Sequence, residues 1–513
     1  MIVGIDFGTT YSAIAALDER GRPITLPNRD GDMLTPSAVY FADDRVIVGQ
    51  AALDAAFETP DRVATLIKRR MGFPDFGRDV AGRAMRPETL AAIVLKKLVR
   101  DAESRIGPVR RAVITVPAYF DDTRRKATET AGRIAGLDVI DVLDEPSAAA
   151  LAYAAQQSTA APDSFPEQTV LVYDLGGGTF DATLVRLARR HFRTIAIEGD
   201  VRLGGKDWDD RIVERVAAEF VRRFGADPRE HGPSLVLLQA AAERAKRTLS
   251  KLTQTTLTCS HAGHVLTMPI TRAEFESWTR DLLTRTRLTV QQLIRGANTS
   301  WDRIDRILMV GGSTHMPMTA QMLREVSGRE PDRALAVSEV VARGAAIHAG
   351  IVAARADASD PALADAARAE LAQVVEVSVI GHSLGVEVRS DGERINDIVI
   401  PKNTQLPAEA TRIYHTVAPG QKRVRVLVLQ GEARQADACI PVGACWIDDL
   451  PPHLPERSPV EVRCACAQNG IVEVFARDLT SGAAVRAELE RTGGLSESEL
   501  LAEQRFVDSL TID

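Results

Sequence analysis

The sequence has few cysteines, no long apolar run and no signal peptide. Five cysteines in 513 residues are sparse and odd in number, which favours a reducing compartment over a disulfide framework. No segment approaches the ~20 apolar residues that span a bilayer. The N-terminus, Met1 to Asp6, carries a carboxylate where a signal peptide needs a basic start and a long apolar core. The sequence therefore predicts a cytoplasmic protein with no membrane partner.

The sequence also lacks an excess of basic charge. Its 63 Lys and Arg residues are outnumbered by 70 Asp and Glu, for a formal net charge of -7. No basic field is present to neutralise phosphates, so nucleic acid is excluded as a partner. With 45% hydrophobic and 26% charged residues, the composition is that of a globular protein, and the length allows two to four domains.

Two different patterns divide the chain. Up to about residue 350, apolar strand-like runs alternate with Ala-rich helical stretches, which is typical of an α/β domain. From about residue 384, short alternating runs are separated by Gly, Pro and Asp turns, which predicts an antiparallel β-sandwich. Representative segments are 111–116, 122–135 and 139–143 in the first region and 384–388, 424–428 and 471–474 in the second.

The pattern also predicts the boundaries between these parts. We expect a first domain over 1–372, a linker over 373–383 and a sandwich over 384–492. The stretch 353–372 is rich in Ala, Asp and Arg and predicts a solvated helix before the linker. In the last segment, 493–513, Ser496 followed by Glu499 predicts a capping box that opens one short helix.

Four cysteines fall in the second region. Cys464 and Cys466 are two apart in an expected strand, so both face the same side. The spacing to Cys439 and Cys445 matches no common zinc pattern. Buried thiols in a β core are favoured over a metal site.

One internal repeat carries most of the functional argument. Segments 2–10 and 170–179 share an apolar strand, an Asp, a Gly-rich turn and a hydroxyl residue. Asp6 and Asp174 would thus leave two related strands at the same depth and face one cleft. The glycines beside them let backbone N–H groups approach phosphate oxygens, and two opposed carboxylates suit a hydrated Mg²⁺. The pair, with a third turn at 311–313 after another strand, predicts a site for a metal nucleotide.

These three turns resemble, in order, the two phosphate loops and the adenosine loop of the actin, hexokinase and heat-shock ATPase superfamily. Further segments are similar to those of DnaK-type seventy-kilodalton heat-shock chaperones, namely 116–120, 144–153, 174–181 and 243–250. The resemblance runs from residue 1 to about 490. It implies an actin-like ATPase domain, with two lobes built on duplicated ribonuclease-H-like cores, followed by an antiparallel β-sandwich.

The resemblance implies a role for each matching residue. Asp6 and Asp174 would hold Mg²⁺ through water, with K⁺ as a further candidate cation. Lys68 would reach the γ-phosphate, and Glu145 and Asp181 would order the attacking water and the metal shell. Residues implied to bind ATP or ADP are Gly8, Thr9, Thr10, Gly176, Gly177, Gly178, Thr179, Gly204, Gly205, Glu243, Lys246, Arg247, Ser250, Gly311, Gly312 and Ser313; Asp174 and Thr179 also belong to the implied catalytic set. By composition alone, Lys68 would be a solvent-exposed lysine on a helix. The residues at 243, 246, 247 and 250 would likewise form a solvent-exposed helix face with an i, i+4 ion pair.

The second domain resembles the peptide-binding sandwich of the same family. Its implied ligand is an extended apolar segment of an unfolded protein, bound through main-chain hydrogen bonds and one apolar pocket. The implied pocket residues are Val386, Val388, Tyr414, Val424, Val426 and Ile471. Alternating apolar residues in a β-sandwich usually form its hydrophobic core, so these six residues have this second interpretation as well.

Several positions depart from the family pattern. Asp141 stands where the family has a basic residue that engages a J-domain partner, and the linker has Glu376 and Ser378 in place of an apolar residue and an Asp. His315 and Ser338 replace an Arg and an Asp near the nucleotide. The segment after Lys68 is shorter than in DnaK, which predicts a smaller upper lobe, and the helical lid of the family is expected to be absent. A J-domain co-chaperone and a nucleotide-exchange factor are therefore implied partners with altered contacts, and peptide exchange is expected to be fast.

The main reading is an ATP-dependent molecular chaperone whose ATP hydrolysis controls peptide binding. One alternative is a slow or regulatory ATPase switch uncoupled from the usual co-chaperones. Another is a small-molecule kinase, since the superfamily fold also phosphorylates sugars.

Overall fold

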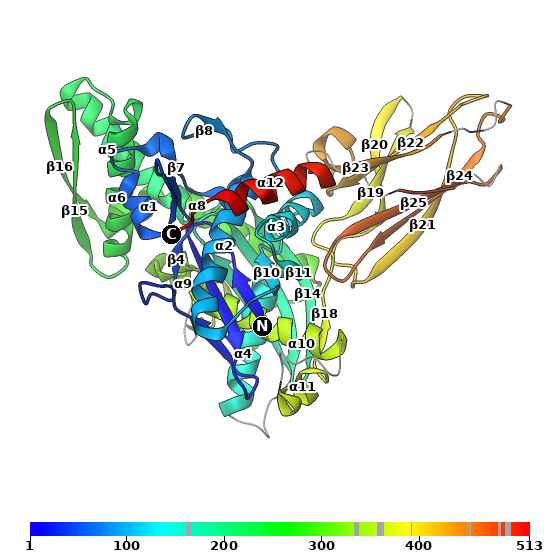
Figure 1. The fold of residues 1–513 in the computed structure, drawn as a ribbon, viewed down its shortest axis with the longest axis horizontal. Coiled ribbons are helices and arrows are strands. Elements are labelled where there is room, and N and C mark those ends of the chain that lie inside the picture. Colours follow the sequence, from blue (N-terminus) through cyan, green and yellow to red (C-terminus); the bar gives the residue numbers. More distant parts are fainter. Residues whose placement is uncertain are drawn as a thin grey trace.

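The computed structural model describes residues 1–160, 166–332, 338–356, 364–390, 392–448, 450, 453–480, 484–487 and 494–513. An α/β body makes up most of the molecule, and a β-rich domain projects from one side of it (Figure 1). Among the described residues, no helix is both long and apolar enough to cross a membrane.

The first sheet of the body places Asp6 at the end of its central strand. Its strand order is β11-β10-β1-β2-β3, with β1 parallel to β10 and antiparallel to β2. Val3 and Ile5 are fully buried because the sheet is covered on both faces, by α2 and α3 on one side and by α10 on the other. The elements are β1 (Ile2–Asp6), β2 (Tyr11–Leu17), β3 (Pro23–Leu26), β10 (Arg111–Val116), β11 (Asp138–Asp144), α2 (Pro87–Ile106), α3 (Asp122–Ile134) and α10 (Val340–Ala356).

The second sheet repeats the local plan of the first. In the order β17-β12-β13-β14-β18, the strand β12 is parallel to β17 and antiparallel to β13. The sequence repeat thus corresponds to a repeat of strand topology. Its strands are β12 (Gln168–Leu175), β13 (Phe180–Ala188), β14 (His191–Asp200), β17 (Arg306–Val310) and β18 (Val375–Val377).

Two Ala-rich helices pack against each other and join the sheets. The helix α4 (Glu145–Ala160) lies on the second sheet through Ala148 and Tyr153, and α10 lies on the first through Ala345 and Ile347. Small side chains permit this close packing. A Cβ on Gly344 of α10 would lie 1.8 Å from the Ala148 carbonyl oxygen.

Further elements rise above each sheet. Above the first, β6 (Val46–Val48), β5 (Val39–Phe41) and β7 (Val63–Ala64) form a three-stranded sheet. Above the second, two long helices pack beside the hairpin of β15 (Gln254–His261) and β16 (His264–Thr271). These helices are α5 (Gly205–Phe224) and α6 (Gly232–Leu249).

The projecting domain consists of two four-stranded antiparallel sheets that share one core. The sheet orders are β20-β19-β22-β23 and β21-β24-β25-β26. Cys445, Cys464 and Cys466 lie in that core and Cys439 is buried nearby, so the buried-thiol interpretation is confirmed. The strands are β19 (Leu384–Ser390), β20 (Glu393–Ile400), β21 (Ala408–His415), β22 (Val424–Gln430), β23 (Ile440–Ile447), β24 (Pro459–Cys466), β25 (Val472–Asp478) and β26 (Ala484–Ala487).

The predicted linker is not a free connection. Its residues 375–377 form β18, which extends the second sheet as a parallel partner of β14, and the Val375 N–H donates to the Arg190 carbonyl at 2.6 Å. The solvated helix expected over 353–372 is found only in part, and residues 357–363 lie outside the described residues. Residues up to Ala356 belong to α10, and α11 (Asp365–Leu371) buries Ala367 and Leu371.

The C-terminal helix returns to the α/β body. As predicted, Ser496 caps α12 (Glu497–Ser509), and the capping box with Glu499 is present. Figure 1 shows this helix lying across α2 and α3 rather than over the β domain. Leu500, Val507 and Ile512 are buried in the core that covers the first sheet. The part of the body built on the first sheet is called the first lobe, and the part built on the second sheet the second lobe.

The residues after α12 extend a sheet. The N–H groups of Val46 and Val48 in β6 donate to the carbonyls of Thr511 and Asp513, each at 2.9 Å. The N–H of Asp513 donates back to the Val46 carbonyl at the same distance. The C-terminal segment is therefore built into the α/β body by both side-chain packing and backbone pairing.

Candidate functional site

The two glycine turns of the sequence repeat face each other. One follows β1 and carries Thr9 and Thr10, and the other follows β12 and carries Gly177 and Gly178. A Cβ on Gly178 would lie 2.5 Å from the Thr9 side chain, and a Cβ on Gly177 would lie 2.6 Å from the Thr10 hydroxyl. These separations leave no room for a side chain at positions 177 and 178. The two turns can therefore lie this close only because both residues are glycine.

The third turn, 311–313, lies against the second. Gly311 has φ 82°, and a Cβ there would be 2.5 Å from Asp174 Oδ1 and 2.4 Å from the Leu175 carbonyl oxygen. The Ser313 hydroxyl donates to the Gly176 carbonyl at 2.9 Å. Gly312 has open space where a side chain would point. The turn is thus held against the second turn by Gly311 and Ser313, and the space in front of Gly312 is open.

The loop at Gly204 and Gly205 completes this cluster. The Gly205 N–H donates to the Gly176 carbonyl at 2.9 Å, and a Cβ on Gly204 would be 2.5 Å from the Gly178 backbone. Gly205 also opens α5, so its end of that helix points into the cluster. The other three predicted turns therefore all contact the second glycine turn, 176–178, or the two residues before it.

Buried carboxylates lie beneath the turns. Burial, reinforced by the negative charge of Glu145, raises the pKa of Asp6 to about 7 and that of Asp181 to about 8. The same two causes raise the pKa of Asp174 well above its usual value. Thr115 Oγ1 donates to Asp6 Oδ1 at 3.3 Å, and the Tyr119 N–H donates to Asp181 Oδ1 at 3.0 Å. Such a concentration of acidic groups favours a bound cation.

Lys68 is the cation that the chain itself supplies. It lies in a single 3₁₀ turn, Ile67–Arg70, and its ammonium pairs with Glu145 Oε1. Only 2% of its side chain is exposed, so the reading of Lys68 as a solvated surface cation is wrong. A buried charge is tolerated only with partners, and here its positive charge also lowers the pKa of Asp6 and Asp174.

The donor set suits a hydrated magnesium ion. Among the described residues, no three His, Cys, Asp or Glu side chains are close enough to hold a metal directly. Mg²⁺ commonly keeps several waters and takes few protein ligands. Asp6 and Asp174 would therefore hold it through its waters; burial and the charge of Glu145 raise the pKa of both carboxyl groups even though Lys68 lowers it.

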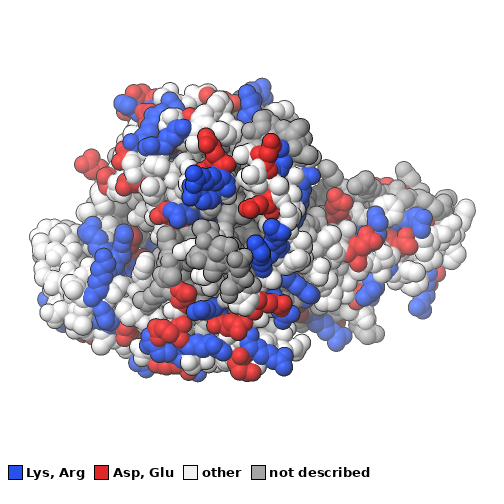
Figure 2. Space-filling model, turned by 90° about the horizontal axis from the view of Figure 1, so that it is seen from below, with Lys and Arg blue, Asp and Glu red and all other residues white. Residues whose placement is uncertain are grey.

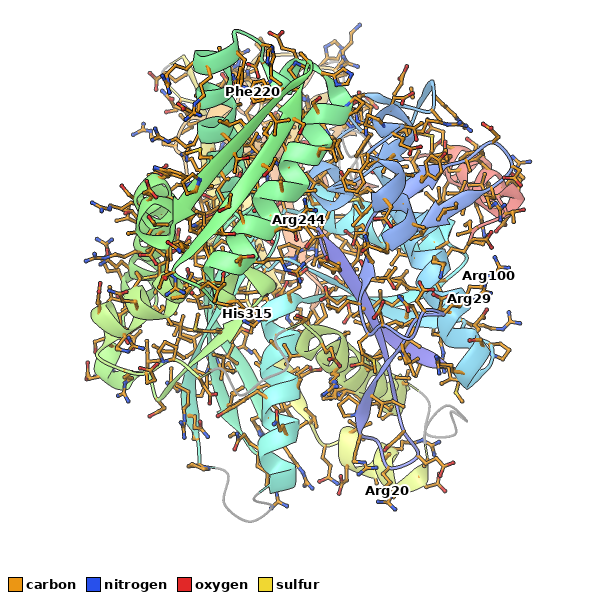
Figure 3. All side chains as sticks on the ribbon, turned by 90° about the vertical axis from the view of Figure 1, so that its left-hand side faces the viewer. Arg20, Arg29, Arg100, Phe220, Arg244 and His315 are labelled. Atoms are coloured by element: carbon orange, nitrogen blue, oxygen red, sulfur yellow. The ribbon has the colours of Figure 1, made fainter. Side chains whose placement is uncertain are left out.

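The helix α6 borders the same cluster. Lys246 donates from Nζ to the Gly205 carbonyl at 2.9 Å and to Asp209 Oδ2 at 2.8 Å, while Glu243 and Arg247 pair at 3.6 Å. Ser250 follows the last turn of the helix, and its hydroxyl donates to the Lys246 carbonyl. Figure 3 shows α6 with Arg244, and the turn with His315, on one side of the molecule.

Sequence reasoning missed two residues that connect the lobes. Arg69 Nε donates to the Gly178 carbonyl at 3.1 Å, and its guanidinium pairs with Asp207 at the start of α5. Arg69 comes from the first lobe and both partners from the second. The position of Arg69 directly after Lys68 was the only sequence feature that pointed to it. Its partner Asp207 lies 138 positions away, so the pairing could not be predicted from the sequence.

The implied peptide residues are divided between core and surface. Val386 and Val426 are 3% and 2% exposed in the core of the β domain. Val388, Tyr414 and Val424 are partly buried against that core, and the Tyr414 hydroxyl donates to Asp397 at 2.7 Å. Ile471 is partly buried just before β25 and beside the α/β body, since the next residue, Val472, donates to Asp122 at 3.0 Å.

A two-sheet α/β body with facing glycine turns, joined to a β domain, fits the class of actin-like ATPases that carry a β-sandwich. Comparison with known proteins identifies one family within this class. A family model described as Hsp70 protein matches residues 2–80 and 75–508. The chain belongs to the Hsp70 protein family.

Several curated relatives are similar over nearly the full chain, and each is described as chaperone protein DnaK. The protein of Thermus thermophilus is 37% identical over 99% of this chain and 82% of its own length. That of Thermotoga neapolitana is 39% identical over 94% of this chain and 79% of its own. That of Thermotoga petrophila is 38% identical over 97% and 82%.

Proposed function

We propose that the cleft between the two lobes binds and hydrolyses Mg·ATP, and that hydrolysis controls the binding of extended apolar peptide segments by the β domain. As an Hsp70 protein similar to DnaK over nearly its whole length, the chain is an ATP-dependent chaperone. The observation that carries the site assignment is the buried pair of Lys68 and Glu145 among three carboxylates of raised pKa.

In this proposal hydrolysis depends on positioning and charge neutralisation. Thr9, Thr10 and the segment 176–179 cradle the phosphates with hydroxyl and backbone N–H donors, and Lys68 reaches the γ-phosphate. Glu145 and Asp181 orient the attacking water. Bound Mg²⁺ supplies the positive charge that the phosphates and carboxylates lack, and Asp6 and Asp174 hold its water shell.

The nucleoside part is assigned to the opposite side of the cleft. Glu243, Lys246, Arg247 and Ser250 form one wall, and the turn 311–313 forms the other. The open space in front of Gly312 supports this placement, since a planar ring needs room there. The loop of Gly204 and Gly205 lies near the ribose and the phosphates.

We further propose the functional division of the chain into an ATPase domain over 1–372, a linker over 373–383 and a peptide-binding sandwich over 384–492. The separate cores of the body and of the β domain support it. The peptide would be held by main-chain hydrogen bonds and an apolar pocket. Opening that pocket would require movement of Val386 and Val426, which are core residues in this structure.

Partners and location also belong to this proposal. A J-domain co-chaperone and a nucleotide-exchange factor are proposed with altered contacts, and a cytoplasmic location is proposed. On the face shown in Figure 2, blue Lys and Arg are interspersed with red Asp and Glu, and neither sign forms a continuous field. This distribution gives nucleic acid no evident surface there.

The second candidate is an ATPase switch uncoupled from peptide binding. It is favoured by the polar linker residues Glu376 and Ser378, which contact His348 and Asp144 of the α/β body, beside the apolar contact of Val379 with Ala118 and Ile197. The kinase alternative gains nothing from the structure and conflicts with membership of the Hsp70 family.

The test is single-turnover ATP hydrolysis with Mg²⁺, with and without an unfolded apolar peptide. Lys68→Ala should lower the rate by roughly 100-fold, whereas Lys251→Ala, an exposed lysine, should leave it unchanged. Stimulation by peptide that depends on Lys68 supports the coupled chaperone. Hydrolysis that depends on Lys68 but not on peptide supports the uncoupled switch, and hydrolysis indifferent to Lys68 refutes the site.

A further inference from the structure

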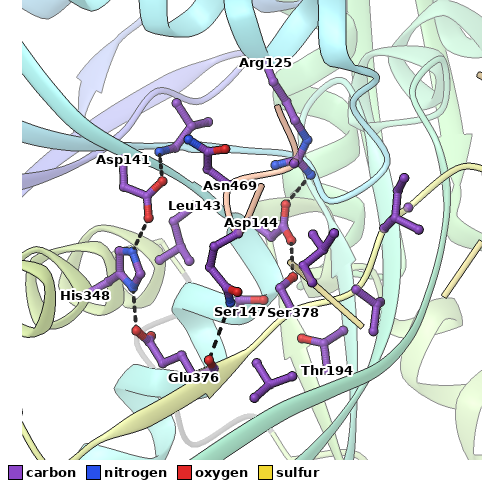
Figure 4. A pocket seen from close by; sticks show the side chains of 18 of the residues that line it. Arg125, Asp141, Leu143, Asp144, Ser147, Thr194, His348, Glu376, Ser378 and Asn469 are labelled. Carbon is purple, nitrogen blue, oxygen red and sulfur yellow. Dashed lines mark hydrogen bonds and ion pairs between the residues drawn. The ribbon is translucent and has the colours of Figure 1, made fainter. Parts of the chain in front are cut away.

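A pocket lies where the linker meets the α/β body. Its lining comes from β11, β14, α4, α10, the linker and the β domain, and it includes Ser147, Thr194 and Asn469 (Figure 4). We call it the linker pocket. The charged residues that line it are Arg125, Asp141, Asp144, His348 and Glu376, joined by a further histidine, His382.

His348 of α10 joins two carboxylates in this pocket. Its Nε2 lies 2.8 Å from Asp141 Oδ2, and its Nδ1 lies 2.8 Å from Glu376 Oε2. Figure 4 shows the ring between the two acidic side chains. A carboxylate only accepts hydrogen bonds, so both ring nitrogens must donate, which requires the protonated ring. Burial by itself would lower the pKa of His348, but the attraction of Glu376 and the hydrogen bonds to both carboxylates raise it to about 10.

The ring holds together three parts of the chain that are distant in sequence. Asp141 belongs to β11, His348 to α10 and Glu376 to the linker strand β18. The side chains of Asp141 and Glu376 are 16% and 14% exposed. Without a cation between them, two poorly solvated negative charges would face each other, which would push the linker away from β11.

A second contact joins the linker to the end of the same strand. The Ser378 hydroxyl lies 3.5 Å from Asp144 Oδ2, and the other oxygen of Asp144 pairs with Arg125. Asp144 is the last residue of β11, and the next residue, Glu145, opens α4 and pairs with Lys68. The linker thus holds β11 at positions 141 and 144, immediately before a proposed catalytic carboxylate.

We propose that His348 is a positioning residue that, as an imidazolium, fastens the linker to β11 and thereby fixes the placement of Glu145. Linker docking in this chain therefore depends on a charged bridge. The negative residues Asp141 and Glu376 are compatible with docking only because His348 is present between them. The effect on hydrolysis rests on the proposed role of Glu145, whereas the effect on docking does not.

The direct test is hydrogen exchange of the linker amides 375–377 at neutral pH in the presence of ATP. His348→Gln should speed exchange by at least about tenfold, because the two poorly solvated carboxylates lose their shared cation. His191→Gln is the matched control. His191 is exposed and lies opposite Val375 in the adjacent strand, so its loss should leave exchange unchanged. Circular dichroism checks that both variants fold.

A variant without the three charges distinguishes an electrostatic role of His348 from a role in packing alone. Adding Asp141→Asn and Glu376→Gln to His348→Gln makes all three groups neutral and able to share hydrogen bonds, and it should restore slow exchange. Normal exchange in His348→Gln would overturn the proposal. Fast exchange that the triple variant does not rescue would also overturn it, because the ring would then act through its shape.

Single-turnover hydrolysis supplies the second readout. His348→Gln should slow hydrolysis by about tenfold while leaving the affinity for ATP unchanged, since it acts through the placement of Glu145 and not on nucleotide contacts. If the unchanged protein and the His191→Gln control do not hydrolyse ATP, the proposed function fails. The exchange experiment would still decide the role of His348 in docking.

Discussion

At the scale of the residue, the candidate site depends on positions where a side chain is impossible or a charge is buried. Gly177, Gly178, Gly204 and Gly311 each stand where a Cβ would come within 2.7 Å of a neighbour. Lys68 is buried together with Glu145. Both features cost stability, since glycine is flexible when unfolded and a buried charge loses water. Such costs are common at functional sites.

Gly311→Ala should lower the free energy of unfolding by about 2–4 kcal/mol, because its φ is positive and its Cβ would overlap Asp174 and Leu175. Gly312→Ala is the matched control in the same turn. Its Cβ would meet open space, so the change in stability should stay within about 0.5 kcal/mol. Thermal unfolding without nucleotide compares the two, and equal effects would contradict the packing argument.

At the scale of the element, α12 and the residues after it belong with the first lobe. Apolar residues of α12 enter the core that also holds Ile67, which opens the turn that carries Lys68, and Met71, which follows that turn. The outer contacts are charged. Lys96 pairs with Asp508 at 2.6 Å, and the Arg83 guanidinium lies 3.9 Å from the centre of the Phe506 ring. The C-terminal segment therefore contributes to the core on which the turn of Lys68 also packs.

Neighbouring leucines of α12 allow a controlled test of this packing. Leu500 is 5% exposed and Leu501 is 48% exposed. Leu500→Ala should cost about 2–4 kcal/mol of unfolding free energy, because it leaves a cavity in the core. Leu501→Ala should cost less than about 0.5 kcal/mol. Urea unfolding measures both. Two small losses would show that α12 contributes little to the stability of the first lobe.

At the scale of the whole molecule, polar contacts join the β domain to the ATPase body. Asp122 receives the N–H of Val472 at 3.0 Å and donates its own N–H to Gln430 at 2.9 Å. Lys402 pairs with Glu198 at 2.7 Å. Together with the linker pocket, these contacts form a mostly polar interface, and polar interfaces within a chain commonly permit relative motion.

The stability of this arrangement should depend on pH through His348. The pKa of His348 is about 10 in the folded protein and near 6.5 when unfolded. Because the folded pKa is raised, the stabilisation is complete below about pH 6.5 and is lost as pH rises toward 10. The difference in unfolding free energy between the unchanged protein and His348→Gln should therefore shrink between pH 7 and 9.5. Urea unfolding at both pH values measures it, and a constant difference would contradict the charged state.

Much of the fold followed from local pattern. The expected strand over 111–116 and the helix beginning at residue 122 are present, and the capping box of Ser496 was found from two residues. These features depend on neighbours along the chain, where period, turn residues and caps act directly. The docking of α12 and the pairing of Thr511 and Asp513 with β6 had no such signal, because their partners lie more than 350 residues away.

By itself, the sequence determined that two related strands end in Asp and glycine turns, that a β domain follows, and that the linker carries charge. Only the tertiary structure decided which charges meet. Asp141 and Glu376 were identified only as departures from the family pattern that alter partner contacts, yet the fold places His348 between them. The physical reason is that an electrostatic contact depends on distance in space, and the three residues lie on separate elements that come together only in the folded chain.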